Sequence, residues 1–94
     1  MIRVLLSERI RKTAGKLPSN LRAEAARVIQ EVGAAFGDPH RHHGLGLRKL
    51  GRRSYEARIH LHWRVVFIHS ENSLIAFDIM THREVGLWLR GQRR

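Results

Sequence analysis

The chain has 94 residues, which is enough for one compact domain and leaves no room for a second. Hydrophobic residues make up 43% of it and allow only a modest core. The 18 Lys and Arg outnumber the 8 Asp and Glu and give a formal net charge of +10. An excess this large favours a polyanionic partner, either RNA, DNA or an acidic protein, over a basic protein that is merely soluble.

The composition excludes several classes of protein. No cysteine is present, so the chain has no disulfide and no thiolate metal site, as expected in a reducing cytosol. The apolar run at residues 2–6 is too short for a signal peptide, and no apolar stretch approaches the length of a membrane span. We therefore expect a cytoplasmic protein that makes no contact with membranes.

The start of the chain predicts a strand followed by a short helix. Apart from Arg3, residues 2–6 are apolar and partly β-branched, which favours a strand. Ser7 is suited to cap a helix, and Gly15 and Pro18 end the helix that it opens. The strand thus leads directly into the first half of a helical hairpin.

The second half of this hairpin is the most regular helix of the chain. Ser19 or Asn20 is expected to cap it, and residues 37–39, Gly-Asp-Pro, end it. Apolar residues recur on one side at helical spacing, namely Leu21, Ala25, Val28, Ile29, Val32 and Phe36. One face of the hairpin is therefore expected to pack on a sheet.

Strands dominate the second half of the sequence. We expect a polar loop at residues 40–46, strands at residues 47–50, 55–61, 63–68 and 74–80, a turn at residues 71–73, and a helix that begins at Thr81 or His82. The predicted order of elements is β-α-α-β-β-β-α. Helices grouped before a meander indicate an α+β fold, in which the helical hairpin packs on one face of an antiparallel or mixed sheet.

Three polar residues of the strand at 55–61 form the first candidate site. Glu56, Arg58 and His60 are two residues apart and therefore project from one face of that strand. Phosphodiester cleavage needs such groups: a base for the attacking hydroxyl, a cation for the phosphorane and an acid for the leaving oxygen. The spacing by itself fits an ordinary solvated strand face better.

Arg64 stands alone among the apolar residues of the strand at 63–68. An unpaired charge inside a protein is costly, so this arginine needs a partner. It either pairs with Asp78 or Glu56, or points out of the sheet toward a phosphate. Its face relative to Arg58 stays open, because a slip of one residue in the hairpin register moves a side chain to the opposite face.

His82 follows a strand and opens the C-terminal helix, with Arg83 beside it. The end of a strand next to a helix N-terminus is a good anion site, and imidazole changes its charge close to neutral pH. A plain capping or surface histidine is the alternative. Trp88, further along this helix, is expected to pack in the core, with stacking on a nucleic-acid base as its alternative.

The chain contains seven histidines, which raises the question of a metal site. His40, His42 and His43 fall in one loop, and the alternation of the strand at 55–61 puts His60 and His62 on one face, without cysteines or carboxylates at ligand spacing. We therefore expect no metal and no cofactor. The loop instead extends a basic surface formed by Arg41, Arg48, Lys49, Arg52 and Arg53.

Four short stretches carry motifs that recur together. They are Leu47-Arg48-Lys49-Leu50, Tyr55-Glu56-Ala57-Arg58-Ile59, Trp63-Arg64-Val65-Val66-Phe67 and Ile79-Met80-Thr81-His82-Arg83-Glu84-Val85. In this order and spacing, and after a helical hairpin, the chain resembles the RelE/ParE superfamily of bacterial toxin–antitoxin systems. The resemblance covers nearly the whole chain and implies a single RelE/ParE-like toxin domain over residues 1–94.

The resemblance implies a toxin that a cognate antitoxin neutralises. RelE-like members cut mRNA in the ribosomal A site without a metal, which stops translation and growth. By position, Arg58 and Arg64 would be phosphate-binding cations and His82 the general acid or base. Glu56, at a position that is often Lys or His in active relatives, would be a further catalytic group. The implied RNA-binding residues are Lys49, Arg48, Arg52, Arg53 and Arg83.

Two alternatives to an mRNA endonuclease remain at this stage. ParE-like members share the fold, lack the nuclease residues and inhibit DNA gyrase, and a non-toxic nucleic-acid-binding module is the other possibility. The fold alone does not choose among these functions. The expected partners are accordingly an antitoxin and either the ribosome with its mRNA or DNA gyrase.

Overall fold

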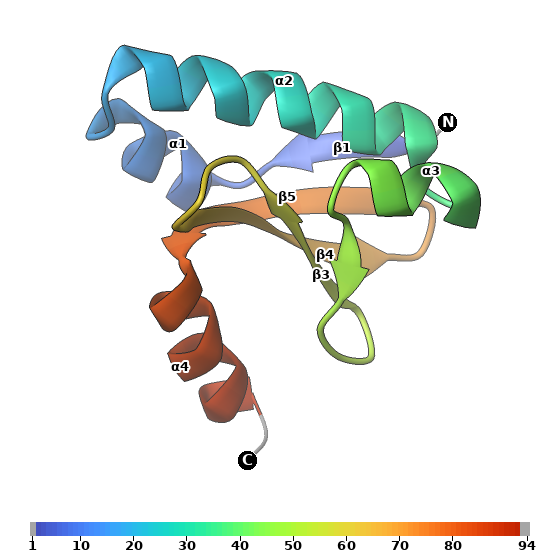
Figure 1. The fold of residues 1–94 in the computed structure, drawn as a ribbon. Coiled ribbons are helices and arrows are strands. Elements are labelled where there is room, and N and C mark those ends of the chain that lie inside the picture. Colours follow the sequence, from blue (N-terminus) through green and yellow to red (C-terminus); the bar gives the residue numbers. More distant parts are fainter. Residues whose placement is uncertain (1, 93–94) are drawn as a thin grey trace.

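A five-stranded mixed sheet lies at the centre of the computed structural model, which describes residues 2–92 (Figure 1). The elements are β1 Arg3–Leu6, α1 Glu8–Gly15, α2 Ser19–Ala35, α3 Pro39–Gly44, β2 Arg48–Lys49, β3 Ser54–Arg58, β4 Trp63–Ser70, β5 Ser73–Thr81 and α4 His82–Gln92. The strands lie in the order β1-β5-β4-β3-β2, with β1 parallel to β5 and the other neighbours antiparallel. The predicted α+β class, with a mixed sheet and a helical hairpin, is confirmed.

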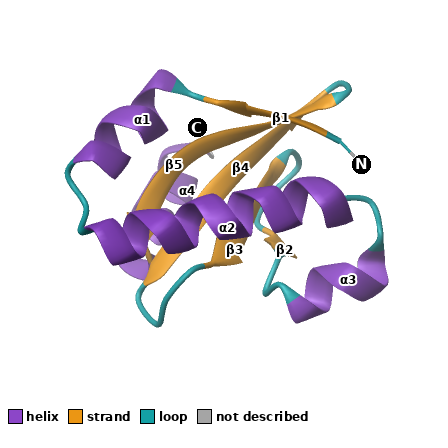
Figure 2. Cartoon of the chain, turned by 90° about the horizontal axis from the view of Figure 1, so that it is seen from above, coloured by secondary structure: helices purple, strands orange, loops and turns teal. Residues whose placement is uncertain are grey.

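Helices cover both faces of the sheet. The hairpin of α1 and α2 lies on one face and α4 on the other (Figures 1 and 2). Because successive side chains of a strand point to opposite faces, Val65 and Phe67 of β4 pack toward the hairpin, whereas Val66 faces α4. The hairpin side holds the larger core, with Ile10, Leu21, Ala25, Val28, Val32, Leu47, Ala57, Ile59, Leu74, Ala76 and Ile79. Trp88 packs beside the smaller core, as predicted, with its ring centroid 5.5 Å from that of Phe77.

The helices begin at local signals in the sequence. Ser7 caps α1 as predicted, because its hydroxyl oxygen accepts a hydrogen bond from the backbone N–H of Ile10 at 3.0 Å. Thr81 and Glu84 form a reciprocal capping box at the start of α4, with bonds of 3.1 and 2.8 Å. α2 follows Pro18, which makes no side-chain cap, so neither residue expected to cap this helix does so. No helix within residues 2–92 combines the length and apolar character needed to cross a membrane.

The connecting segments differ from the sequence prediction. Residues 40–46, expected as a loop, lie largely in α3, because Asp38 caps this helix and Pro39 stands in its first turn. The strand expected at residues 55–61 ends earlier, and residues 59–62 form the turn into β4. The observed order is β-α-α-α-β-β-β-β-α. The helix α3 was not predicted, whereas β2 corresponds to the short strand predicted at residues 47–50, which the predicted order of elements did not count.

β1 and α2 approach each other closely at Gly33. The backbone N–H of Ile2 donates a hydrogen bond to the carbonyl oxygen of Gly33 at 3.1 Å. A Cβ atom added to Gly33 would lie 2.8 Å from Cγ2 of Val4, which is too close for two carbon atoms. Since the β-branched Val4 has little rotamer freedom, a side chain at residue 33 would push α2 away from the sheet.

We predict that Gly33→Ala lowers the free energy of unfolding by about 1–2 kcal/mol, because overpacking outweighs the gain in helix propensity. Gly15→Ala, at the end of α1, is the matched control, since nothing lies within 4 Å of an added Cβ there. The control should leave stability unchanged or raise it by up to about 1 kcal/mol. Urea denaturation measures both variants, and equal effects would contradict the close packing of β1 on α2.

Candidate active site

A cleft of about 330 Å³ opens beside the start of α4. It is lined by His43, Gly46, Leu47, Arg48, Glu56, Arg58, Arg64 and His82, and we call it the basic cleft. Five of these residues were predicted from the sequence as site residues, namely Arg48, Glu56, Arg58, Arg64 and His82. They belong to β2, β3, β4 and α4, so only the folded chain brings them together.

The strand register aligns the side chains of the basic cleft. Arg58 stands opposite Arg64 in the β3–β4 hairpin, and Glu56 stands opposite Arg48 on β2 and Val66 on β4. Residues directly opposite each other share one face of a sheet, as do residues two apart in a strand. The four strand residues therefore project from the face that Val66 shares with α4, and His82 reaches the cleft from α4 itself. The sequence left the face of Arg64 open, and the structure places it on the face of Arg58.

Glu56 is a buried carboxylate rather than part of a solvated strand face. The residue is 4% exposed, and its Oε2 accepts a hydrogen bond from Nε of Arg48 at 2.8 Å. The same oxygen lies 3.8 Å from Nε of Arg64. Its Oε1 is buried without a hydrogen-bond partner in the described part of the chain. A buried acceptor without a partner is costly, so this carboxylate sits in the fold at an energetic cost.

The other two members of the predicted polar strand face lie differently. Arg58 is exposed at the end of β3, as predicted. His60 is exposed as well, but it lies in the turn after β3 and is not among the residues that line the basic cleft. The predicted alignment of three polar groups on one strand is therefore wrong at His60, because the strand ends before it.

Arg64 holds the turn between β3 and β4. Its Nη1 donates hydrogen bonds to the carbonyl oxygens of His60, Leu61 and Trp63 at 3.3, 3.3 and 3.0 Å. The side chains of Arg64 and Glu56 are 9% and 5% exposed, so their ion pair, one of the predicted alternatives, is largely buried. Asp78, the other partner considered, is bound instead by Arg9 and Thr13 of α1, at 2.9 and 2.6 Å. Since Arg64 also lines the cleft, it joins the turn to the site.

His82 enters the cleft from the first turn of α4. Its backbone N–H donates a hydrogen bond to the carbonyl oxygen of His62 at 3.0 Å. The capping box of Thr81 and Glu84 closes the same end of the helix, so the position of His82 is set from two directions. Arg83 is the next residue of α4, exposed and outside the residues that line the cleft.

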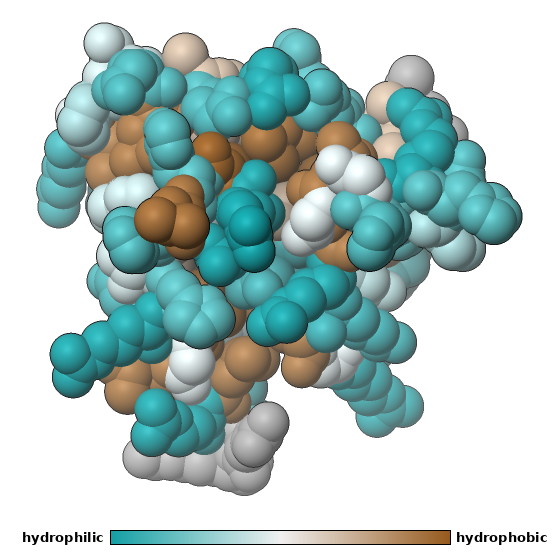
Figure 3. Space-filling model, viewed as in Figure 1, coloured by the Kyte–Doolittle hydropathy of each residue, from teal (hydrophilic) through white to brown (hydrophobic). Residues whose placement is uncertain are grey.

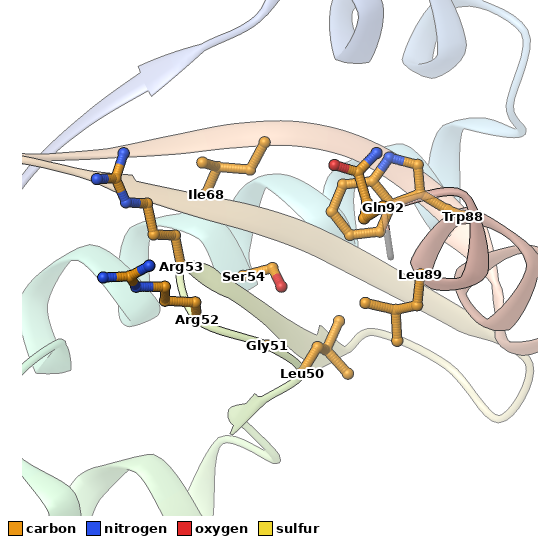
Figure 4. A pocket seen from close by; sticks show the side chains of 9 residues that line it. All are labelled: Leu50, Gly51, Arg52, Arg53, Ser54, Ile68, Trp88, Leu89 and Gln92. Carbon is orange, nitrogen blue, oxygen red and sulfur yellow. The ribbon is translucent and has the colours of Figure 1, made fainter. Parts of the chain in front are cut away.

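Arg52 and Arg53, two of the predicted RNA-binding residues, also lie outside the basic cleft. They line a second hollow of about 400 Å³ between the β2–β3 connection and α4 (Figure 4). Its other lining residues are Leu50, Gly51, Ser54, Ile68, Trp88, Leu89 and Gln92. In Figure 4 the two guanidinium groups lie at one end of this hollow and the Trp88 ring at the other. Lys49 stands opposite Tyr55 and so faces away from its neighbour Arg48.

His43 is the one titratable residue among those that line the cleft that was not predicted as part of the site. The sequence prediction assigned it to a loop, whereas it lies in the last turn of α3. The backbone N–H groups of Gly46 and Leu47 donate to the carbonyl oxygens of His43 and His42 at 3.2 and 3.0 Å, which ties α3 to β2. Asp38-Pro39 is a helix-start signal that could have revealed this. Within residues 2–92, no three His, Asp or Glu side chains are grouped so that they could hold a metal ion.

The basic cleft keeps an excess of positive charge. Its three arginines and one carboxylate sum to +2 when the imidazoles are neutral. On α2, by contrast, Arg27 is neutralised locally: hydrogen bonding between Arg27 and Glu24 lowers the pKa of the carboxyl and raises that of the guanidinium. Hydrophilic side chains also cover much of the face seen in Figure 3. The single carboxylate of the cleft does not balance its three arginines, and the remaining positive charge suits a phosphate group.

Comparison with known proteins identifies the fold. The chain is similar to a chain of the archaeal RelE–RelB complex from Pyrococcus horikoshii OT3, with a TM-score of 0.67 and 15% identity over 85% of this chain and 93% of that one. A chain of the RelB–RelE antitoxin–toxin complex from Methanococcus jannaschii is similar with a TM-score of 0.68 and 13% identity, and the match covers 89% of this chain and 96% of that one. The YoeB/ParE toxin from Agrobacterium tumefaciens has a TM-score of 0.62 and 16% identity, and the match covers 86% of this chain and 99% of that one.

These likenesses rest on structure alone. No protein-family model matches the sequence, and no curated protein sequence matches it significantly. The chain therefore has the fold of the RelE/ParE toxins, in agreement with the resemblance seen in its sequence motifs.

We predict that Glu56→Gln lowers the free energy of unfolding by about 3 kcal/mol, because it leaves the buried Arg64 without a compensating charge. Glu24→Gln is the matched control, since it removes an exposed ion pair with Arg27 and should leave stability nearly unchanged. Urea denaturation of both variants measures the difference. A Glu56 variant as stable as the control would show that the carboxylate does not organise the cleft.

Proposed function

We propose that the chain is the toxin of a toxin–antitoxin system and cuts mRNA on the ribosome without a metal ion. The observation that carries this proposal is the basic cleft, which unites three arginines, a carboxylate and two imidazoles from five elements. The fold supports it, since the similar solved structures include toxins and toxin–antitoxin complexes. The net charge of +10 suits binding to a phosphate backbone.

Attack by the RNA's own 2′-hydroxyl requires only the kinds of group that line the cleft. The 2′-oxygen forms a bond to the neighbouring phosphorus as its proton passes to a base. The bond between phosphorus and O5′ breaks as an acid protonates the leaving oxygen. The products are a 2′,3′-cyclic phosphate and a 5′-hydroxyl, and the step consumes no other reactant. Side chains must therefore supply two proton transfers and stabilise the charge on phosphorus.

Each cleft residue has a role in this step that follows from its environment. Arg58 is exposed at the end of β3, so its guanidinium is free to bind the scissile phosphate and stabilise the phosphorane. Arg64 supplies the second cation from the opposite strand. His82 exchanges a proton with the substrate. Glu56 orients Arg48 and Arg64 through its Oε2.

The predicted RNA-binding residues outside the cleft would contact the flanking chain. Lys49, Arg52, Arg53 and Arg83 are all exposed. Cations at such positions neutralise phosphates without reading the sequence of the RNA. They would hold mRNA and ribosome against the domain while the scissile phosphate occupies the cleft.

An antitoxin partner is part of the same proposal. The similar chains from Pyrococcus horikoshii and Methanococcus jannaschii were solved in complexes of RelE with RelB. An acidic or amphipathic segment would match the positive charge of this chain. Co-expression with the product of a neighbouring reading frame for a short acidic protein should restore growth, and continued growth arrest would count against this partner.

We predict that Arg58→Gln and His82→Gln each lower the rate of mRNA cleavage at least about 100-fold and relieve growth arrest. Both side chains are exposed, so the fold should survive these changes. Arg11→Gln, on the exposed surface of α1, is the matched control and should stay fully toxic. Mapping of mRNA ends on ribosomes after induction measures cleavage.

A gyrase assay run beside this experiment separates the alternatives. Intact mRNA together with blocked supercoiling by the purified chain would assign a ParE-like gyrase inhibitor, and both variants would then stay toxic. Unimpaired growth on expression of the chain alone would instead assign a non-toxic binding module. Either result contradicts the endonuclease proposal.

A further inference from the structure

His43 occupies a position in the basic cleft that the proposed roles leave unused. It lines the cleft from the last turn of α3, at the opposite edge of the site from α4. Its side chain is exposed, so it is accessible to a ligand. Transesterification of RNA needs two proton transfers at two different oxygens, and one imidazole serves only one of them at a time.

Among the residues that line the cleft, the titratable candidates for the second transfer are Glu56 and His43. The carboxylate is 4% exposed, and its Oε2 is shared between Arg48 and Arg64. A buried carboxylate whose oxygen is shared by two guanidinium groups serves to position them and is poorly placed to exchange a proton with a substrate. The imidazole of His43 has neither restriction, and imidazole both takes and gives protons near neutral pH.

The order of elements across the sheet places the two imidazoles on either side of the arginine pair. His82 follows β5, and Thr81 before it pairs with Trp63 beside Arg64. Arg64 pairs with Arg58 on the next strand. Since neighbouring strands lie about 4.8 Å apart, β5 and β3 are roughly 10 Å apart, a span that accommodates a phosphodiester between flanking side chains.

The segment that carries His43 is fixed against the far side of Arg58. Gly46, with a φ of +64°, lets the chain turn from α3 into β2. A Cβ added to this glycine would lie 3.6 Å from Cβ of Arg58, so the backbone of this turn lies in contact with β3. The hydrogen bond from the N–H of Gly46 to the carbonyl of His43 then sets the end of α3 beside the cleft.

We propose that His43 is a second catalytic imidazole of the cleft, which works with His82 on the two oxygens that exchange protons during RNA cleavage. One imidazole takes the 2′-hydroxyl proton as the bond between O2′ and phosphorus forms. The other, as imidazolium, gives its proton to O5′ as the bond to phosphorus breaks. The pair ends the step with its protonation states exchanged. This inference rests on the proposed endonuclease function.

Charged and titratable groups on several elements surround His43. Across the cleft these are Arg48, Glu56, Arg58, Arg64 and His82, and on its other side Arg27 and Glu31 of α2 line an adjoining hollow of about 510 Å³ together with it. A pH profile therefore reports the coupled behaviour of the cleft. With one imidazole required neutral and the other protonated, the wild-type profile should be bell-shaped.

The test compares His43→Gln with His40→Gln, an exposed histidine of the same helix that is not among the cleft residues. Cleavage of ribosome-bound mRNA by the full-length chain is measured from pH 5 to pH 9. His43→Gln should lower the rate at least about 100-fold and remove one limb of the bell. His40→Gln should keep the wild-type rate within about twofold and both limbs.

Two results would overturn the inference while leaving the endonuclease function intact. One is a His43→Gln variant that cleaves at the wild-type rate. The other is a slower variant that keeps both limbs of the profile, which would make His43 a structural residue. A wild-type chain that cleaves no mRNA would overturn the proposed function, and the role of His43 with it.

Discussion

One buried carboxylate, that of Glu56, organises the site. Through a single oxygen it holds Arg48 of β2 at 2.8 Å and Arg64 of β4 at 3.8 Å, and so links three strands. Arg64 in turn donates hydrogen bonds to carbonyl oxygens of the β3–β4 turn. These bonds fix the end of the hairpin at which Arg58 lies. Buried ion pairs add little net stability after desolvation, so the benefit here is a defined geometry. Arg58 stays exposed and free for a ligand while its neighbours are held in place.

Much of the fold could be predicted from the chain because its local signals are strong. The apolar spacing from Leu21 to Phe36 and the cap at Ser7 predict the helical hairpin, and the structure has it. α3 was missed because Asp38-Pro39 was interpreted only as the end of α2, although the same pair starts a helix. The strand at 55–61 was predicted too long, since its alternation continues into the turn that Arg64 holds.

The candidate site was predictable as a set of residues but not as an arrangement. Arg58, Arg64 and His82 were selected from motifs, and the fold does bring them to one cleft. Whether Arg64 shares a face with Arg58 depends on the hairpin register, which one residue of slip reverses. The burial of Glu56 and the approach of His43 depend on contacts between distant segments. No local sequence pattern predicts contacts between distant segments, so the burial of Glu56 and the position of His43 could be seen only in the folded chain.

The chemical form of the cleaved RNA ends tests the account most directly. Purified chain, ribosomes and a defined mRNA are incubated with a chelator that binds the free divalent ions but leaves those that the ribosome retains. The RNA fragments are then analysed by mass spectrometry. Attack by the 2′-hydroxyl predicts an upstream fragment with a 2′,3′-cyclic phosphate, or the 3′-phosphate formed from it, and a downstream fragment with a 5′-hydroxyl. An upstream fragment with a 3′-hydroxyl and a downstream fragment with a 5′-phosphate, or the absence of any cut, would contradict cleavage by attack of the RNA's own 2′-hydroxyl.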